Sequence, residues 1–284
     1  MKNQRVTIAI TSKDRHTECT LLLQSLRQQT HQEFDIILQD DASGLPVTQS
    51  GFLMPVVNRI KLEGHKVKII RRDRSDGVCA ARNNLIDEDD FHNPLTLRCD
   101  DDVILQPDYI ERLVKIINKG YDMATGVVPL VAFPSVKREV KYVGKIICRH
   151  ELDKDGNLVM NNDDLGFCYI EQAILPCDQF RTNCLYKTEI QQKVRYPPNL
   201  TTVGFREEGF FSLSAIILGY TIGVDVQAIA LHLATSSGGV RRNDYSQCVA
   251  LDDDSFKKWL REKFLLHGDF LNKYHKKVSK NVKN

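Results

Sequence analysis

The feature of this sequence that most restricts its fold is an alternation, through residue 120, of short apolar runs with segments of helical pattern. Four runs are brief and bounded by turn-forming or charged residues, which is typical of buried strands: Val6–Ile10, Phe34–Gln39, Lys66–Arg71 and Leu95–Arg98. The segments with helical spacing are the stripe Leu22, Leu23 and Leu26, then Met54–Leu62, Ala80–Ile86, and Pro107 to Gly120. Strand–helix–strand repetition predicts an α/β fold with a parallel, doubly wound sheet, whose ligands bind at the carboxyl ends of the strands.

The second half of the chain follows a looser pattern. We expect strands at Met123–Val128, Val140–Ile147, Phe167–Leu175 and Thr221–Leu233. Helices are expected at Lys187–Lys193, at Arg206–Leu218 before Gly219, and in a basic segment from Ser255 onward. Because no repeat or long linker interrupts the chain, we expect one domain over residues 1–250, followed by a C-terminal basic amphipathic helix or tail at 251–284.

Composition excludes several classes of protein. The chain has 42% hydrophobic and 27% charged residues, so it can bury a core and is not wholly disordered. Its net charge of 39 − 37 = +2 argues against bulk binding of nucleic acid. No apolar run approaches the ~20 residues of a membrane span, and the first residues lack the apolar stretch of a secretion signal. The eight cysteines show no zinc spacing, so we expect reduced thiols in a cytoplasmic protein.

Acidic residues gather where two of the predicted strands end. Asp40 and Asp41 follow the second strand, and Asp100, Asp101 and Asp102 follow the fourth. Turn and capping preferences explain such residues singly, but three consecutive acids repel one another and need a counter-charge. Clustered carboxylate oxygens suit a hard cation, Mn²⁺ or Mg²⁺, that also carries a substrate phosphate. The sequence therefore predicts a metal site at this edge of the sheet, with turn-forming acids as the alternative.

Five segments form a set in a fixed order along the chain. They are VTIAITSKDR at Val6–Arg15, FDIILQDDAS at Phe34–Ser43, GVCAARN at Gly77–Asn83, LRCDDDVILQP at Leu97–Pro107, and REEG at Arg206–Gly209 with Gly219-Tyr220 after it. Over residues 6–233 this set resembles the family 2 glycosyltransferases, which use nucleotide-sugar donors. The resemblance implies the GT-A fold, a Rossmann-like α/β domain with a mixed, mainly parallel sheet flanked by helices. It also implies a donor half at residues 1–120 and an acceptor half at 121–250.

On the donor side, the resemblance implies roles for five residues. Thr11 and Asp41 would contact the nucleotide base, and Arg82 would lie along the base or the phosphates. Asp100 or Asp101 would touch the ribose or the hydration shell of the metal. For Arg82 the plain alternative is a surface arginine on a helix.

The metal ligands implied by the resemblance are Asp102 and His232. Asp102 would bind the Mn²⁺ or Mg²⁺ ion that bridges both phosphates and offsets the charge that develops on the nucleoside diphosphate. His232, at the end of a predicted strand, would be a further ligand or, alternatively, a hydrogen-bonded core histidine. Arg241 and Arg242, after the flexible segment Ser236–Gly239, would clamp the diphosphate from a mobile loop, or else lie on an ordinary solvated one.

Glu207 and Glu208 stand where the family has Glu-Asp. Counting back twelve positions from Gly219 aligns Glu207 with the family glutamate, and so Glu208 with the aspartate that usually serves as the base. In an inverting transferase this carboxylate removes the acceptor proton as the hydroxyl oxygen attacks the anomeric carbon. Neighbouring helical residues point ~100° apart, so one of the two faces the sugar; the alternative is two acids favoured by the helix dipole. Asp178 and Asn183 fall in the region that usually faces the acceptor, although no motif fixes them.

The function implied by the resemblance is metal-dependent, inverting transfer of a hexosyl or N-acetylhexosaminyl group. The donor would be a UDP-sugar, and the acceptor a hydroxyl of a carbohydrate, glycolipid or glycoprotein in surface polysaccharide or glycolipid synthesis. Two alternatives stay open: a sugar-phosphate nucleotidyltransferase, and a non-catalytic module that binds nucleotide sugars or membranes. The glycine-rich loop typical of the nucleotidyltransferases is missing from Thr11–Arg15, which counts against the first.

The C-terminal segment keeps membrane binding open. From Lys257 to Lys283, basic residues interleave with aromatic ones, among them Trp259, Phe264 and Tyr274. This composition suits peripheral contact of an amphipathic helix with the anionic inner face of a membrane. A packed helix with a frayed basic tail is the alternative.

Overall fold

The computed structural model describes residues 4–132, 137–139, 146–153, 158–160, 163–235, 238–239 and 244–281. The four strands predicted in the first half are confirmed: β1 (Val6–Ser12), β2 (Phe34–Asp40), β3 (Val67–Arg71) and β4 (Leu95–Asp100). They pair in parallel, with β1 between β2 and β4 and with β3 beside β2. Their apolar runs are continuous because most of these residues are covered on both faces of the sheet.

Five further strands complete the sheet within the described residues. They are β5 (Val103–Leu105), β6 (Met123–Val127), β11 (Ile174–Pro176), β12 (Cys184–Lys187) and β13 (Ile222–His232). The order is β11-β13-β6-β12-β4-β1-β2-β3, with β5 paired to β13. Since β12 runs antiparallel to both β4 and β6, the sheet is mixed but mainly parallel, as predicted. Two small ribbons lie outside it: β7 (Lys137–Arg138) with β10 (Cys168–Tyr169), and β8 (His150–Leu152) with β9 (Leu158–Met160).

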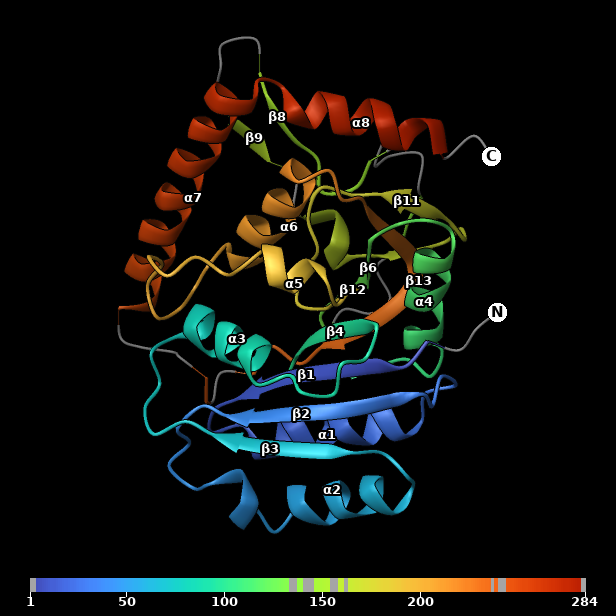
Figure 1. The fold of residues 1–284 in the computed structure, drawn as a ribbon, viewed down its shortest axis with the longest axis vertical. Coiled ribbons are helices and arrows are strands. Elements are labelled where there is room, and N and C mark those ends of the chain that lie inside the picture. The colour runs from blue at the N-terminus through green and yellow to red at the C-terminus, as the bar shows by residue number, and fades with distance from the viewer. Residues whose placement is uncertain are drawn as a thin grey trace.

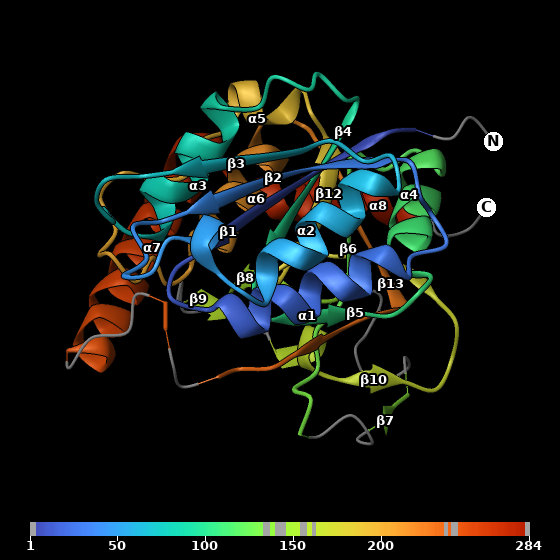
Figure 2. The ribbon, with the colours of Figure 1, turned by 90° about the horizontal axis from the view of Figure 1, so that it is seen from below.

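Helices cover both faces of this sheet (Figures 1 and 2). One face carries α1 (His16–Arg27), η1 (Val47–Gln49), α2 (Leu53–Leu62) and α4 (Tyr109–Asn118), whose apolar residues share one core cluster with the strands. The other carries α3 (Val78–Asp87), η3 (Asp163–Gly166), α5 (Ile190–Lys193) and α6 (Glu207–Ile217). The predicted stripe Leu22, Leu23 and Leu26 is fully buried on α1.

Four predictions for the second half need correction or fall outside the described residues. The strand predicted at Phe167–Leu175 is wrong in its middle, where the exposed Ile170 separates β10 from β11. The helix predicted at Lys187–Lys193 is shorter, because β12 ends at Lys187. The strand predicted at Val140–Ile147 lies mostly outside the described residues, although Ile147 bridges to Cys177. The basic helix begins earlier than Ser255, as α7 (Tyr245–His267), so residue 250 lies inside a helix.

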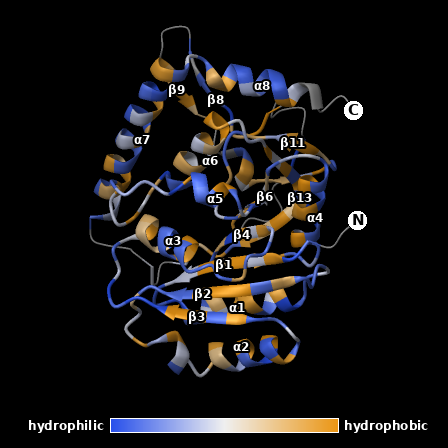
Figure 3. Ribbon diagram, viewed as in Figure 1, coloured by the Kyte–Doolittle hydropathy of each residue, from blue (hydrophilic) through white to orange (hydrophobic). Residues whose placement is uncertain are grey.

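The C-terminal segment forms two packed helices. Gly268, with φ of 61°, separates α7 from α8 (Phe270–Asn281). On α8 the apolar residues Leu271, Tyr274 and Val278 are buried in the core that also holds α6. Figure 1 shows α7 along one side of the molecule and α8 across its end, and Figure 3 shows hydrophilic and hydrophobic residues mixed along both. The apolar face of α8 therefore meets protein, as in the packed-helix alternative. In the described part of the chain, no helix has both the length and the apolar character to cross a membrane.

Asp35, at the start of β2, makes a buried polar network whose effect on stability depends on pH. Its carboxylate accepts hydrogen bonds from Nε of Arg5 (2.7 Å), the backbone N–H of Lys66 (2.9 Å) and Nδ2 of Asn93 (3.2 Å). Burial alone would raise the pKa of Asp35, but these bonds outweigh it and lower the pKa to about 2, from 3.8.

We therefore expect Asp35→Asn to lower the free energy of unfolding by about 2 kcal/mol at neutral pH. Because the folded pKa is depressed, this contribution is present above about pH 4 and disappears as the pH falls to about 2. Urea unfolding of both proteins across this range measures it, with the exposed Asp73→Asn, outside this network, as control. A deficit that is the same at both ends of the range would contradict the ionic origin.

Candidate active site

A cleft opens at the carboxyl ends of β1 and β4, where the first turn of α6 and the end of β13 meet them. Its volume is about 280 Å³. Strand ends and a helix N-terminus converge here, which is the usual ligand position in a parallel sheet. The residues that line it are Thr11, Lys13, Arg15, Asp41, Val78, Arg82, Arg98, Asp100, Asp101, Asp102, Val203, Gly204, Phe205, Glu207, Glu208, His232, Gly239 and Tyr245.

Asp100 is fixed by arginines, as the repulsion within the acidic triplet requires. Arg82 and Arg98 both contact its carboxylate, and Nη2 of Arg98 lies 3.2 Å from Oδ1. Arg82 also donates to the backbone carbonyl of Cys99 at 3.2 Å. The backbone N–H of Asp100 donates to Oδ1 of Asn183 at 3.2 Å. Arg82 of α3 and Arg98 of β4 therefore hold the carboxylate of Asp100 at the edge of the cleft, and Asn183, before β12, holds its backbone.

Asp101 and Asp102 share one guanidinium. Nη1 of Arg15 lies 3.2 Å from Oδ1 of Asp101 and 2.9 Å from Oδ2 of Asp102. Burial raises the pKa of Asp101 to about 7, against the opposing charge of Arg15. Burial acts in the same direction on Asp102, but a hydrogen bond and the charge of His232, together with Arg15, outweigh it and lower the pKa. Asp102 is therefore ionised at neutral pH, as a metal ligand must be.

Asp102 and His232 form the candidate metal site. Nε2 of His232 lies 3.3 Å from Oδ2 of Asp102. Adjacent ligands on an octahedral ion with bonds of about 2.1 Å lie about 3 Å apart, so these two atoms fit one divalent ion. Among the described residues, no group of three or more His, Cys, Asp or Glu side chains is arranged to hold a metal. The remaining ligands would be phosphate oxygens or water.

The start of α6 is fixed by α7. Arg206, directly before α6, has φ of 73°, a left-handed conformation uncommon for a residue other than glycine. Its Nε donates to Oδ1 of Asp253 at 2.7 Å. The buried carboxylate of Asp252 accepts from the backbone N–H groups of Thr201 (2.7 Å) and Phe205 (2.8 Å). These contacts hold the turn that places the first residues of α6 in the cleft.

The two glutamates of α6 lie in different surroundings. The side chain of Glu207 is 5% exposed and forms an ion pair with the buried Arg98. Burial raises the pKa of Glu207, while the charge of Arg98 opposes the shift. The side chain of Glu208 is 22% exposed, and its Oε1 lies 3.8 Å from Nη1 of Arg98. Glu208 is therefore the more accessible to a ligand, while Glu207 belongs to a buried ion pair.

Polar groups at the other end of the cleft suit a nucleotide base. The carboxylate of Asp41 accepts hydrogen bonds from Nη1 of Arg72 (2.8 Å) and from the Ser75 hydroxyl. Within the described residues, the buried Oγ1 of Thr11 has no hydrogen-bond partner. A carboxylate has about four acceptor positions, so Asp41 keeps capacity for a donor on a ligand.

The structure brings most of the predicted site residues together. Nine of them line the cleft: Thr11, Asp41, Arg82, Asp100, Asp101, Asp102, Glu207, Glu208 and His232. Arg241 and Arg242 lie outside the described residues. Two residues expected near the acceptor do not line the cleft. Asp178 is buried and accepts a hydrogen bond from Nε2 of His275 on α8 at 2.8 Å, and Oδ1 of Asn183 accepts one from the backbone N–H of Asp100.

Three residues that shape the site were not predicted from the sequence: Arg15, Arg98 and Asp252. A signal existed for Arg98, because a charge inside the apolar run Leu95–Cys99 needs a buried partner. No local signal marks Asp252, whose partners lie about 50 positions earlier in the chain.

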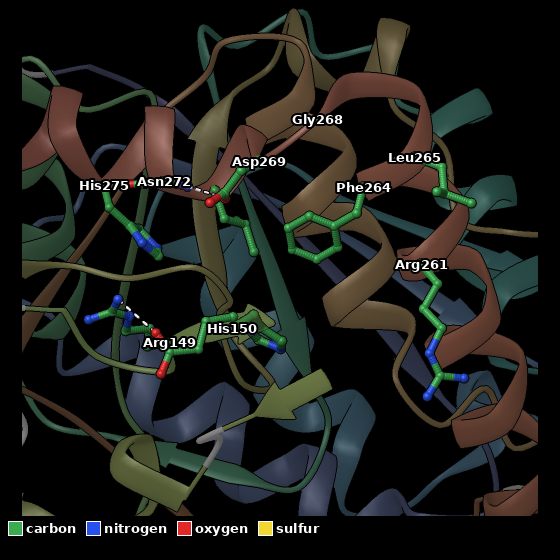
Figure 4. Close-up of a pocket in the computed structure, with 11 residues that line it drawn as sticks. Arg149, His150, Arg261, Phe264, Leu265, Gly268, Asp269, Asn272 and His275 are labelled. Atoms are coloured by element: carbon green, nitrogen blue, oxygen red, sulfur yellow. Dashed lines mark hydrogen bonds and ion pairs between the residues drawn. The ribbon is translucent and has the colours of Figure 1, made fainter. Parts of the chain in front are cut away.

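A second cavity, of about 640 Å³, lies where α7 meets α8 (Figure 4). Its two acids already have partners: Glu151 pairs with Arg149 at 2.7 Å, and Asp269 accepts from the backbone N–H of Asn272 at 2.9 Å. Unlike the cleft, it is not lined by the acids that follow β2 and β4, so the cleft is the stronger candidate for chemistry.

Comparisons with known proteins place this geometry in context. A family model described as Glycosyl transferase family 2 matches residues 7–171. No curated protein matches the sequence. Among solved structures, the chain is similar to GalNAc-T7 with UDP, GalNAc and Mn²⁺, with a TM-score of 0.60 and 14% identity over 81% of this chain and 44% of that chain. It is also similar to the mannosyltransferase PcManGT from Pyrobaculum calidifontis in complex with GDP-Man and Mn²⁺, with a TM-score of 0.54 and 12% identity over 82% of this chain and 58% of that chain.

The chain spans about half the length of these two structures. At such identities the likeness shows the fold alone. It confirms the predicted GT-A arrangement of a mixed, mainly parallel sheet flanked by helices.

Proposed function

The chain belongs to glycosyl transferase family 2, and we propose that it moves a sugar from a nucleoside diphosphate donor to an acceptor hydroxyl with inversion at the anomeric carbon. One observation carries the proposal: the accessible carboxylate of Glu208 and the Asp102–His232 pair line the same cleft. A single displacement needs one base beside the acceptor and a stabilised leaving group on the donor, and these residues would supply both.

In this proposal the donor lies along the carboxyl edge of the sheet. Thr11 and Asp41 bind the base, Arg82 lies along the base or phosphates, and Asp100 or Asp101 meets the ribose. A UDP-sugar fits because uracil offers an imide N–H to the carboxylate of Asp41. A bound Mn²⁺ or Mg²⁺ ion would offset the charge of the departing diphosphate.

Glu208 accepts the proton of the acceptor hydroxyl as its oxygen attacks. A general base must be ionised to do this, and the guanidinium of Arg98, 3.8 Å away, is its counter-charge. Glu207 does not reach the acceptor but holds Arg98 in place from the core. We propose a hexosyl or N-acetylhexosaminyl group as the sugar, and surface polysaccharide or glycolipid synthesis as the setting.

The metal assignment predicts that Asp102→Asn lowers sugar transfer by about 100-fold, because the site loses its charged ligand. Rates would be measured as nucleoside diphosphate release across a Mn²⁺ titration. The variant should need more Mn²⁺ for half-maximal rate, whereas Asp254→Asn, on the exposed side of α7, should behave as the wild type. A normal rate and a normal Mn²⁺ dependence in Asp102→Asn would refute the assignment.

We propose peripheral membrane contact through the corner of α7 and α8 rather than through a free amphipathic helix. Leu265 and Leu266 are 86% and 73% exposed there, and Lys273, Lys276 and Lys277 are exposed on α8. Anionic lipid attracts each such lysine by about 1 kcal/mol. Reversing all three to glutamate should abolish co-sedimentation with phosphatidylserine vesicles but leave transfer to a soluble acceptor unchanged. Equal sedimentation of both proteins would count against membrane contact.

A further inference from the structure

A hollow of about 430 Å³ lies between α6 and α7, away from the donor cleft. We call it the Trp259 hollow. Phe210 and Ser214 of α6 form one wall, and α7 forms another from Ser255 to Glu262. It shares no lining residue with the cleft. The segment before α6 lines the hollow at Pro197 and Asn199 and the cleft from Val203 to Phe205, so the two sites use different residues of one loop.

Trp259 is the one tryptophan in the sequence, and it is half-buried at the edge of this hollow. Its ring is fixed by two aromatic neighbours, with centroids 4.8 Å from Phe210 and 5.9 Å from Phe256, and the flexible side chain of Lys263 places Nζ 5.7 Å from its centroid. Within the described residues, no acceptor is recorded for its indole N–H, which remains available to a ligand. A rigid, partly exposed indole loses little conformational freedom when a ligand stacks on it.

Polar side chains surround the indole. Asn199, Ser255, Lys258 and Glu262 line the hollow, and none makes a side-chain hydrogen bond or ion pair in the structure's described ranges. They offer amide, hydroxyl, ammonium and carboxylate groups, so donors and acceptors are both present.

The charged residues that line the hollow nearly balance, and Lys263 beside the Trp259 ring adds one positive charge. Lys258 and Glu262 are opposite in sign, and Arg195 at the rim is offset by Asp87 at 2.8 Å. A phosphate-bearing or other anionic ligand would need a larger positive excess than this single charge. A purely apolar ligand would remove these polar groups from water without forming hydrogen bonds to them, which would weaken its binding. A ligand with many hydroxyls and an apolar ring face matches both the indole and its neighbours.

From this geometry we propose that the Trp259 hollow is a second carbohydrate-binding site, which stacks a neutral sugar ring on Trp259 and bonds its hydroxyls to Lys258 and Glu262. It deepens the proposed transferase function, on which it rests, by giving the acceptor or product glycan a contact outside the reaction centre. Such a contact retains a growing chain between transfers without entering the chemistry.

The single tryptophan makes the test direct, because its emission reports on this hollow alone. Wild-type protein, without donor or metal, would be titrated with maltohexaose, cellohexaose and hexa-N-acetylchitohexaose, with sorbitol as the control polyol. We expect a saturable change in emission with one of the three oligosaccharides and none with sorbitol. Loss of one hydrogen bond to a charged group weakens binding by about tenfold or more, so Glu262→Ala and Lys258→Ala should each raise the Kd by that factor.

Both side chains lie at the protein surface, so neither variant should unfold the protein, and Asp254→Ala on the same helix is the matched control. The proposal is overturned if no oligosaccharide changes the emission, or if both hollow variants bind as tightly as the control. Because the titration contains no donor, this failure is distinct from a failure of the transferase proposal, which would appear as absent turnover of nucleotide sugars.

Discussion

Glu208→Gln is expected to lower the rate of sugar transfer by about 1,000-fold, since a positioned general base contributes factors of 10² to 10⁴. The amide keeps the shape of the side chain but cannot accept the proton of the acceptor hydroxyl. Donor binding should be unchanged, because Glu208 is proposed to act on the acceptor. Nucleoside diphosphate release gives the rate, and calorimetric titration with the donor gives the affinity.

Glu207→Gln is the matched control for this prediction. Its carboxylate is nearly buried against Arg98 and should affect transfer only through the stability and position of that arginine. If Glu208→Gln transfers sugar at the wild-type rate, Glu208 is not the base. If Glu207→Gln alone shows the large loss, the two roles are reversed.

The second large effect concerns stability. Arg98→Met is expected to lower the free energy of unfolding by about 3–5 kcal/mol, because it leaves a buried carboxylate without its counter-charge. Arg98 stands on the central strand β4, where it pairs with Glu207 and lies 3.2 Å from Asp100. This loss is a large share of the 5–15 kcal/mol that typically stabilises a domain.

The loss should depend on pH. Burial raises the pKa of Glu207 above its ordinary value, and removal of Arg98 takes away the opposing charge. A carboxyl group whose pKa is raised in the folded protein adds to the free energy of unfolding at low pH, and this contribution is lost as the pH rises. Arg98→Met should therefore be less destabilised at about pH 5 than at about pH 8. Adding Glu207→Gln should restore part of the stability at the higher pH. A deficit below about 1 kcal/mol at both pH values would show that the pair is not the stabilising element.

The part of the site proposed to bind the donor could be predicted from the sequence, because the strands that carry it are recognisable from short stretches of sequence. The strands β1, β2 and β4 are continuous apolar runs, and parallel strands must end at the same edge, which brings Asp41 and Asp102 together. His232 could be predicted only through the family resemblance, since its closeness to Asp102 depends on the pairing of β13 with β5.

Other features depend on long-range contacts and have no local signal. β12 has four residues, too few to show a period, and its place between β4 and β6 is set by tertiary packing. The turn before α6 is held by Asp252 and Asp253 of α7. The sequence gives no sign that α7 packs against this turn, because the contacting residues are about 50 positions apart. The packing of α8 likewise depends on Tyr274, whose hydroxyl donates to the carbonyl of Cys177 at 2.8 Å.

The most direct test of the proposed function is product release from a panel of UDP- and GDP-sugars, with Mn²⁺ and then with EDTA. We expect one donor to release its nucleoside diphosphate with Mn²⁺, and chelation or Glu208→Gln to stop transfer to an added acceptor. The contradicting result is no turnover of any nucleotide sugar, together with pyrophosphate release from a nucleoside triphosphate and a sugar phosphate.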